Sequence, residues 1–271
     1  LLDCCYDEKL TVVRGDAREK DLMAKLMKDV DIIIPLACLT GAPLCDKDPI
    51  SAGTTNLDAI KLVMELRSEE QRVVFPTTNS GYGIGQKDKY CDENTPLNPV
   101  SLYGKLKTEA ERCVLDGVNT ITMRLATVFG ASPRMRLDLL VNDFTYRAVY
   151  DRFIVLFEAR FKRNYIHIRD IARAFIHCLE NFESMKGEPY NVGLGDCNIS
   201  KRDLCEEIKK QIPEFHIIES EIGKDPDKRD YIVSNEKIEA TGFKPRFSLQ
   251  FGITELIKVY RIVKRNQYAN I

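Results

Sequence analysis

The sequence predicts an α/β protein with a doubly wound parallel sheet and a smaller, mixed C-terminal lobe. Short apolar runs at residues 10–13, 30–36, 72–75 and 120–125 alternate with amphipathic stretches such as 56–67 and 101–116. Strands that alternate with helices favour a parallel sheet with helices on both faces. After Gly130 the alternation gives way to Arg-rich loops and a helical pattern over 137–150. We therefore divide the chain at residues 1–131 and 132–271, and expect strands at 165–170 and 190–193 that return to the first region or bridge the two.

Composition narrows the class of protein. The chain has 271 residues, of which 44% are hydrophobic, and its 40 basic and 41 acidic side chains leave a net charge of −1. No long-range field therefore favours nucleic acid or an anionic membrane. No apolar run reaches the roughly 18 to 20 residues of a membrane span, and no signal peptide opens the chain, so we expect a cytoplasmic protein. Nine cysteines without a C-x-x-C pattern, and only three histidines, predict reduced thiols and no metal site.

Two residues have the spacing of a proton-handling pair. Lys107 follows Tyr103 by four positions, so on a helix both side chains share a face and the ammonium can stabilise a phenolate. The strand at 72–75 runs into Thr78, at the carboxyl end of a parallel strand, where ligands bind in such sheets. Thr78 can therefore hydrogen-bond a substrate hydroxyl. Tyr260 and Lys264 repeat the spacing, but we interpret them as an ordinary solvated helix face.

These residues belong to a longer pattern. Thr78 is followed by Tyr82 and Gly83, then by ENTP at 93–96, NPVSLYGKLK at 98–107 and EAE at 109–111. The pattern resembles the NAD-dependent epimerase/dehydratase family, a group of extended short-chain dehydrogenases/reductases. The resemblance implies a Rossmann-like fold, NAD as cofactor, a sugar nucleotide as substrate and a homodimer. It also implies that Thr78, Tyr103 and Lys107 form the catalytic set.

The resemblance assigns cofactor contacts in addition to Tyr103 and Lys107. Gly15 and Asp16 match the family's adenine-contacting pair, with Ala17 beside them, although a simple helix cap is the alternative for Asp16. The family's small-residue turn corresponds to Leu36 and Ala37, preceded by Pro35 where the family usually has His. Asn56 matches a family asparagine, or else caps a helix. The family's G-x-x-G-x-x-G turn is absent, so we expect a fragment whose first βαβ unit precedes Leu1.

The resemblance also proposes residues for the sugar nucleotide. These substrate contacts are Thr78, Asn79, Thr127, Arg134, Arg136, Asn142, Arg163 and Arg229. Guanidinium groups suit a diphosphate, and surface ion pairing with Asp138, Asp143 or Asp230 is the alternative. Helices at 57–66 and 101–116 would form the dimer interface, unless Ile60, Val63, Met64 and Leu66 face the sheet.

The reaction class follows from what stands after Thr78. Dehydratases and decarboxylases of the family carry a Glu two residues after the Thr, whereas this chain has Asn79 and Ser80. We therefore expect redox chemistry at C4 of the sugar. Stretches at 34–45, 124–136, 140–144 and 225–231 resemble members that oxidise C4 of a GDP-heptose in surface polysaccharide synthesis. A UDP-hexose 4-epimerase is the alternative, and a non-catalytic sugar-nucleotide-binding protein is the second.

Overall fold

A four-stranded parallel sheet forms the centre of the molecule. The computed structural model describes residues 4–86, 89–221 and 229–262. The sheet has the order β1-β2-β4-β8, built from β1 (Ile32–Ile33), β2 (Arg72–Thr78), β4 (Thr120–Leu125) and β8 (Pro189–Val192). β2 and β4 pair over six residues, from Val73 opposite Thr120 to Thr78 opposite Leu125. The predicted α/β class is therefore confirmed, and the carboxyl end of β2 presents Thr78.

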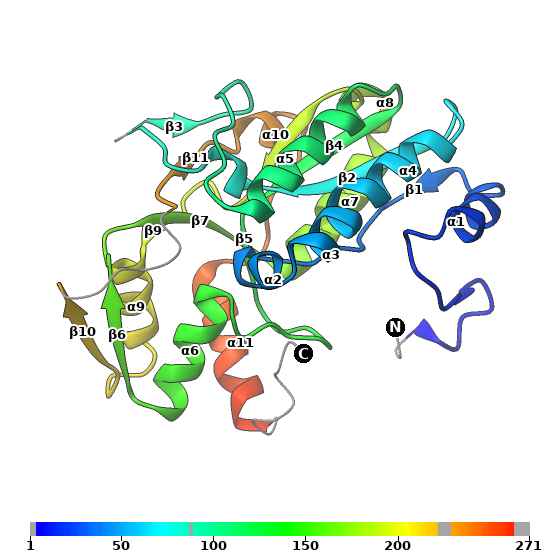
Figure 1. The fold of residues 1–271 in the computed structure, drawn as a ribbon. Helices are drawn as coiled ribbons and strands as arrows, with labels where there is room; N and C mark the ends of the chain where they lie inside the picture. The colour runs from blue at the N-terminus through cyan, green and yellow to red at the C-terminus, as the bar shows by residue number, and fades with distance from the viewer. Residues whose placement is uncertain (1–3, 87–88, 222–228, 263–271) are drawn as a thin grey trace.

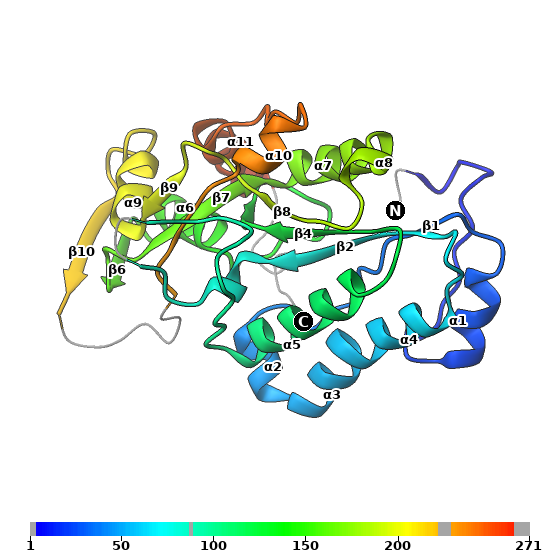
Figure 2. The ribbon, with the colours of Figure 1, turned by 90° about the horizontal axis from the view of Figure 1, so that it is seen from above.

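Helices cover both faces of this sheet (Figure 1, Figure 2). One face carries α1 (Lys20–Met27), α2 (Ala42–Lys47), α3 (Pro49–Gly53), α4 (Ala59–Leu66) and α5 (Leu102–Leu115). The other carries α7 (Ile168–Glu180), α8 (Phe182–Met185) and α10 (Glu236–Ala240). The helix expected at 56–67 opens as a π-helical turn, η2 (Thr54–Asp58), which continues into α4. This doubly covered arrangement explains why β2 and β4 consist largely of apolar and β-branched residues.

Helix α5 follows the sequence prediction closely. Ser101 precedes the helix in an extended conformation, and its Oγ accepts a hydrogen bond of 3.1 Å from the backbone N–H of Gly104. Asp116 ends the helix, so the predicted range 101–116 is the helix with its two caps. Ala110 and Val114 are fully buried against Val73 and Phe75 of β2. Capping and packing together fix the helix that carries Tyr103 and Lys107.

The C-terminal half builds smaller elements around a second core. Three strands, β5 (Thr127–Phe129), β7 (Lys162–His167) and β9 (Asn198–Ser200), form one sheet. Two pairs complete the strands: β6 (Phe153–Phe157) with β10 (His216–Ser220), and β3 (Tyr90–Cys91) with β11 (Ile232–Val233). The helices α6 (Leu140–Tyr150), α9 (Lys201–Lys209) and α11 (Leu249–Ile262) contribute buried side chains to this second core. The expected strand at 165–170 ends at His167, where α7 begins. The division of the chain at residues 131 and 132 stays a prediction.

Three sequence expectations differ from the structure. Residues 10–13 form no strand, and Val12 is 64% exposed, because no described strand lies beside them to pair with. The strand expected at 30–36 shortens to β1, which pairs with β2 alone at the edge of the sheet. Tyr260 is not solvated: it is fully buried in the second core and donates a hydrogen bond of 2.9 Å to the carbonyl of Asn142. Lys264 lies outside the described residues.

Two further properties bear on the sequence expectations. None of the helices in the described part of the chain combines the length and the apolar character that a membrane crossing requires. No disulfide bond joins any two of the nine cysteines, all of which lie in the described part of the chain.

Candidate active site

The carboxyl end of β2 turns sharply and fixes the Thr78 hydroxyl. Residues 79–82 form a 3-10 turn, η3 (Asn79–Tyr82), in which the Ser80 N–H donates to Thr78 Oγ1 over 3.1 Å. The Thr78 hydroxyl in turn donates to Ser80 Oγ over 2.9 Å. Arg229 also donates to Ser80 Oγ, from the C-terminal half of the chain. Thr78 therefore keeps one acceptor position on its oxygen for a substrate hydroxyl.

Tyr103 comes to the same place because the first turn of α5 rests on η3. A Cβ added to Gly104 would lie 3.2 Å from the Ser80 carbonyl oxygen and 2.9 Å from Pro99 Cβ, so only glycine permits this approach. Burial raises the pKa of Tyr103 above its usual value of 10. The guanidinium groups of Arg136 and Arg229 oppose this rise. The two arginines thus lie where they favour the phenolate.

Lys107 lies one helical turn further along α5 and is only 5% exposed. Its Nζ is 3.9 Å from the centroid of the Phe75 ring, three residues before Thr78 on β2. Burial lowers the pKa of Lys107 from 10.5 to about 8, while Cys38 and Glu111 favour its charged form. The aromatic face supplies further stabilisation to the cation. Thr78, Tyr103 and Lys107 are therefore arranged along β2 and α5 as a hydroxyl, a phenol and an ammonium.

Asn79 adds a polar group that the protein itself leaves unused. Its side chain is 1% exposed, and neither Oδ1 nor Nδ2 has a hydrogen-bond partner among the described residues. An unsatisfied buried amide costs about 1 to 3 kcal/mol. Because Asn79 follows Thr78 directly, its position fits a polar ligand bound beside the Thr78 hydroxyl.

Asn56 holds the loop between β1 and α2. Its Oδ1 accepts from the Leu39 N–H over 2.8 Å, and its Nδ2 donates to the Leu39 carbonyl over 2.9 Å. The thiols of Cys38 and Cys45 donate to the same carbonyl. Asn56 is 1% exposed and caps no helix, so the alternative of a cap is wrong and the side chain acts as a brace for this loop. The loop leaves the predicted cofactor residues Leu36 and Ala37 exposed.

The predicted adenine-contacting pair lies in an exposed turn before α1. Asp16 accepts hydrogen bonds of 2.9 Å from both the backbone N–H and the Nε of Arg18. These bonds lower the pKa of Asp16 to about 2. The N-cap of α1 is Glu19, so Asp16 does not cap that helix. Ala17 is partly buried in the same turn. Contacts of Asp16 and Ala17 with a cofactor stay predictions.

The predicted substrate residues separate into two groups. The charges of Arg136 and Arg229 both favour the phenolate form of Tyr103. Arg136 also reaches the loop that Asn56 holds, because a Cβ added to Gly41 would lie 3.5 Å from Arg136 Nη2. Arg136 also pairs with Asp138, which was the alternative expected for it. Arg134 is exposed and Thr127, at the start of β5, is partly buried. Arg136 and Arg229 therefore lie near Tyr103, and contacts of Arg134 and Thr127 with a substrate stay predictions.

Two other predicted substrate residues are buried. Arg163 is 1% exposed and donates to the Lys162 carbonyl over 2.8 Å, so its guanidinium is engaged within β7. Asn142 is 2% exposed, accepts from the Gly130 N–H over 3.1 Å and donates to the Arg136 carbonyl over 2.8 Å. In this structure Asn142 fixes the loop that carries Arg136. Direct contacts of Asn142 and Arg163 with a substrate stay predictions.

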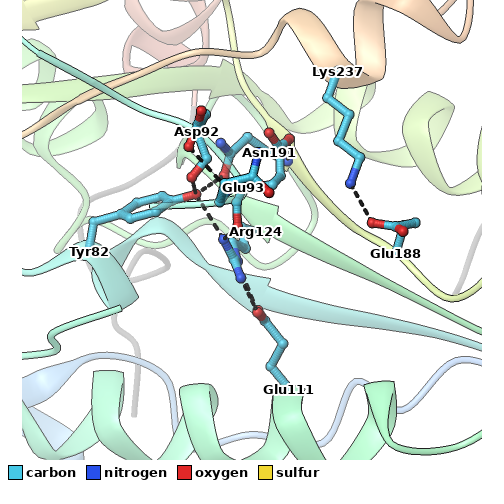
Figure 3. Close-up of polar contacts among 9 residues, drawn as sticks. Tyr82, Asp92, Glu93, Glu111, Arg124, Glu188, Asn191 and Lys237 are labelled. Carbon is cyan, nitrogen blue, oxygen red and sulfur yellow. Dashed lines mark hydrogen bonds and ion pairs between the residues drawn. The ribbon is translucent and has the colours of Figure 1, made fainter. Parts of the chain in front are cut away.

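A buried polar network under the site was not anticipated from the sequence (Figure 3). Arg124 of β4 donates to Glu111 Oε1 of α5 from Nε over 2.9 Å and from Nη2 over 2.6 Å. Its Nη1 donates to Tyr82 Oη over 3.0 Å, and Tyr82 donates to Asn191 Oδ1 over 2.7 Å. The sequence carried two signals of this network. Arg124 is a charged residue inside the apolar strand 120–125, and Glu111 is an acidic residue one helical turn after Lys107.

The residues present fit the nicotinamide end of a dinucleotide. The unused amide of Asn79, the hydroxyl of Thr78 and the pair Tyr103 and Lys107 offer polar partners around one place. The described residues contain no glycine-rich turn between a strand and a helix that could hold a pyrophosphate. The fit is therefore to the redox end of the cofactor.

The family follows from this fold and from comparison with known sequences. The model of the NAD dependent epimerase/dehydratase family matches residues 4–193, well over half of the chain, and the protein belongs to this family. A putative UDP-glucose 4-epimerase of Methanocaldococcus jannaschii is 25% identical, covering 92% of this chain and 83% of the relative. The bovine dTDP-D-glucose 4,6-dehydratase is 24% identical, covering 92% of this chain and 73% of the relative.

Solved structures agree with the fold. The dTDP-glucose 4,6-dehydratase of Bacillus anthracis, in complex with NAD, superposes with a TM-score of 0.81 at 20% identity, covering 99% of this chain and 84% of that chain. The UDP-glucose 4-epimerase of Thermus thermophilus, also in complex with NAD, superposes with a TM-score of 0.79 at 20% identity. The match covers 95% of this chain and 86% of that chain. At this identity the likeness establishes the Rossmann-type fold.

Proposed function

We propose that this protein is an NAD-dependent oxidoreductase that acts on C4 of a sugar nucleotide and yields a 4-keto sugar. The observation that carries the proposal is the fixed Thr78 hydroxyl at the end of β2, with Tyr103 and the buried Lys107 on the adjoining face of α5. Removing hydride from a secondary alcohol requires a base for the hydroxyl proton. A tyrosine supported by a lysine cation supplies that base.

Each residue of the set has a separate task. Thr78 accepts the C4 hydroxyl through its remaining lone pair and orients it. Tyr103, as the phenolate, takes the proton and becomes a neutral phenol, and before this transfer the Lys107 ammonium stabilises the negative charge of the phenolate. The guanidinium groups of Arg136 and Arg229 lie near enough to favour the phenolate as well. When bound, NAD⁺ supplies the hydride acceptor for this step. Tyr103 and Lys107 are also the proposed contacts to the nicotinamide riboside, with Asn79 as a polar neighbour.

The turn after Thr78 supports redox chemistry without elimination. Ser80 stands two residues after Thr78, and its hydroxyl is engaged by Thr78 and Arg229. A hydroxyl group held in this way is a poor acid or base at neutral pH compared with a carboxylate. A second proton transfer, which the loss of water from the sugar requires, has no carboxylate at this position.

For the substrate we propose a GDP-heptose, as in the GDP-D-glycero-D-manno-heptose 4-dehydrogenases of surface polysaccharide synthesis. The support is the resemblance of the stretches 34–45, 124–136 and 140–144, which in this structure hold Gly41, Arg136 and Asn142 together. Residues 225–228 of the fourth stretch lie outside the described residues. Arg134, Arg136 and Arg229 are the proposed contacts to the diphosphate.

A 4-epimerase acting on a UDP-hexose is the second candidate. The observation that favours it is the match over 92% of this chain to the putative UDP-glucose 4-epimerase of Methanocaldococcus jannaschii. The catalytic set would be the same, because an epimerase also oxidises C4 before it returns the hydride to the other face of the sugar. The two candidates differ in whether the oxidised sugar leaves the protein.

A homodimer in the cytoplasm stays a prediction for this protein. Ile60 and Val63 are buried against the sheet, as the alternative to a dimer interface expected. The outer faces of α4 and α5 are joined by an exposed ion pair between Lys61 and Glu109. Size-exclusion chromatography of the wild type and of a Lys61→Glu variant tests whether this face mediates association.

One incubation separates these candidates. The purified protein is mixed with NAD⁺ and either GDP-heptose or UDP-glucose, with and without 2-ketoglutarate as a second oxidant. The proposal expects reduced cofactor and a GDP-sugar lighter by two hydrogen atoms in the mass spectrum. A product of unchanged mass and inverted C4 establishes the epimerase. Tight binding of the sugar nucleotide without either product would reject both enzymes in favour of a binding protein.

A further inference from the structure

Glu111 is a buried carboxylate that uses only half of its hydrogen-bonding capacity. Its side chain is 2% exposed, and both bonds from Arg124 go to Oε1. Oε2 is buried and has no hydrogen-bond partner among the described residues. A carboxylate with one unsatisfied buried oxygen is costly, so its retention calls for an explanation outside the ion pair itself.

The position of Glu111 on α5 explains why this carboxylate is retained. Tyr103, Lys107 and Glu111 follow one another at intervals of four residues, so they lie along one face of the helix. Lys107 stands between the other two, and the Glu111 carboxylate is therefore nearer to Lys107 than to Tyr103. Arg124 fixes the carboxylate through two bonds to one oxygen, and Tyr82 fixes Arg124 (Figure 3). The network thus holds a negative charge behind the lysine.

Resting on the proposed function, we infer that Glu111, anchored by Arg124, is a positioning residue that keeps the shared proton of the catalytic pair on Lys107 and off Tyr103. The pair can hold that proton in two ways of equal net charge: ammonium with phenolate, or neutral amine with phenol. A negative charge nearer to Lys107 stabilises the first arrangement more than the second. Only the first arrangement has a base ready for the substrate hydroxyl.

The surroundings of Lys107 make this contribution necessary. Burial favours the neutral amine and lowers the pKa of Lys107 to about 8, and the Phe75 ring offers only a partial compensation. Among the described residues, the other titratable or charged groups that act on the pair are Cys38 in the loop before α2, Cys45 on α2, Arg136 and Arg229, and Arg124 on β4 lies behind Glu111. Of these, Cys38 also favours the ammonium form.

The test removes both charges of the anchoring pair. Replacing Glu111 alone would leave Arg124 buried and unpaired, which costs about 3 to 5 kcal/mol and can prevent folding. The double variant Glu111→Gln/Arg124→Gln keeps the net charge of the protein and the capacity for hydrogen bonds. The matched control is Asp170→Asn/Arg173→Gln, which removes another pair with a buried carboxylate, on α7 across the sheet from α5.

The first readout needs no turnover. The ultraviolet absorbance of the phenolate is titrated with pH in the NAD⁺-saturated protein, and the same titration of the matching Tyr103→Phe protein is subtracted. We expect the midpoint of Tyr103 ionisation to rise by about one pH unit in the Glu111/Arg124 variant and to stay unchanged in the control. A repeat in the Cys38→Ser background checks that the thiol does not cause the shift.

The second readout is kinetic. With a sugar nucleotide that the wild type turns over, kcat falls about tenfold and KM stays within twofold, because Glu111 touches no substrate. A folded double variant with an unshifted phenolate titration overturns the inference. A shifted titration in a protein that turns over no sugar nucleotide keeps the inference about Glu111 and refutes the proposed function instead.

Discussion

The centre of the sheet and its N-terminal edge show how much an apolar run depends on its neighbours. The run at 72–75 becomes β2, paired with β1 on one side and β4 on the other, and Val73, Val74 and Phe75 are all buried. The run at 10–13 has a similar composition but no described strand beside it, and Val12 is 64% exposed. A strand is completed by pairing, so the same pattern predicts structure at the centre and fails at the edge.

The ion pairs of the two regions also differ in their exposure to solvent. At the centre, Glu111 and Arg124 are nearly inaccessible to solvent and hold each other in a fixed geometry behind Lys107. At the edge, Asp16 and Arg18 pair with about two fifths of each side chain exposed. Exposed pairs contribute little to stability, whereas a buried pair is costly to break. The ion pair that is costly to break therefore lies between β4 and α5, and the exposed pair lies at the edge.

The largest stability difference between the two regions is expected from apolar truncation. Phe75→Ala should lower the free energy of unfolding by about 3 to 5 kcal/mol, since it opens a cavity under Lys107 and removes an aromatic contact to the ammonium. Val12→Ala, at the exposed edge, should change it by less than about 0.5 kcal/mol. Urea denaturation of both variants measures this. Equal losses at the two positions would show that residues 10–13 are packed in solution.

Replacement of Lys107 is expected to raise the free energy of unfolding, whereas truncation of Phe75 lowers it. The pKa of Lys107 is depressed from 10.5 to about 8, so below about pH 8 the folded protein bears the cost of a buried cation, and this cost disappears as the pH rises toward 10.5. Lys107→Met should therefore raise the free energy of unfolding at neutral pH by about 3 kcal/mol while abolishing turnover. The gain should shrink between pH 8 and 10.5. A variant that is less stable than the wild type at neutral pH would contradict the burial cost.

The smallest contrast is expected between the N-cap of α5 and the exposed turn before α1. Ser101→Ala removes the side-chain bond to the Gly104 N–H and should cost about 1 kcal/mol, because α5 loses its N-cap. Asp16→Asn removes the charge from an exposed turn and should leave the melting temperature nearly unchanged above pH 4. The pKa of Asp16 lies at about 2, so its small contribution is present at higher pH and is lost as the pH falls toward that value. Thermal melts at several pH values compare the two, and a larger loss for Asp16→Asn would reverse the ranking.

The sequence predicted the elements whose signals are local. The helix over 101–116 and the strand at 120–125 both follow from residues next to one another in the chain. The positions of Thr78 at a strand end and of Tyr103 and Lys107 one helical turn apart could be predicted in the same way, and their catalytic roles stay predictions. The burial of Arg163 and Tyr260 depends on packing between distant segments, as does the brace that Asn56 forms with Leu39. Glu111 and Arg124 meet across thirteen residues and two elements, so local pattern gave no sign of their pairing.

Two tyrosine variants give the sharpest test of Tyr103 as the base. Both Tyr103 and Tyr260 stand four residues before a lysine, and only Tyr103 lies beside Thr78. Reduction of NAD⁺ is followed with the sugar nucleotide that the wild type oxidises. We predict a loss of about 100-fold or more for Tyr103→Phe, and activity within a few-fold of the wild type for Tyr260→Phe, which loses one buried hydrogen bond. Wild-type turnover by folded Tyr103→Phe protein would contradict the account.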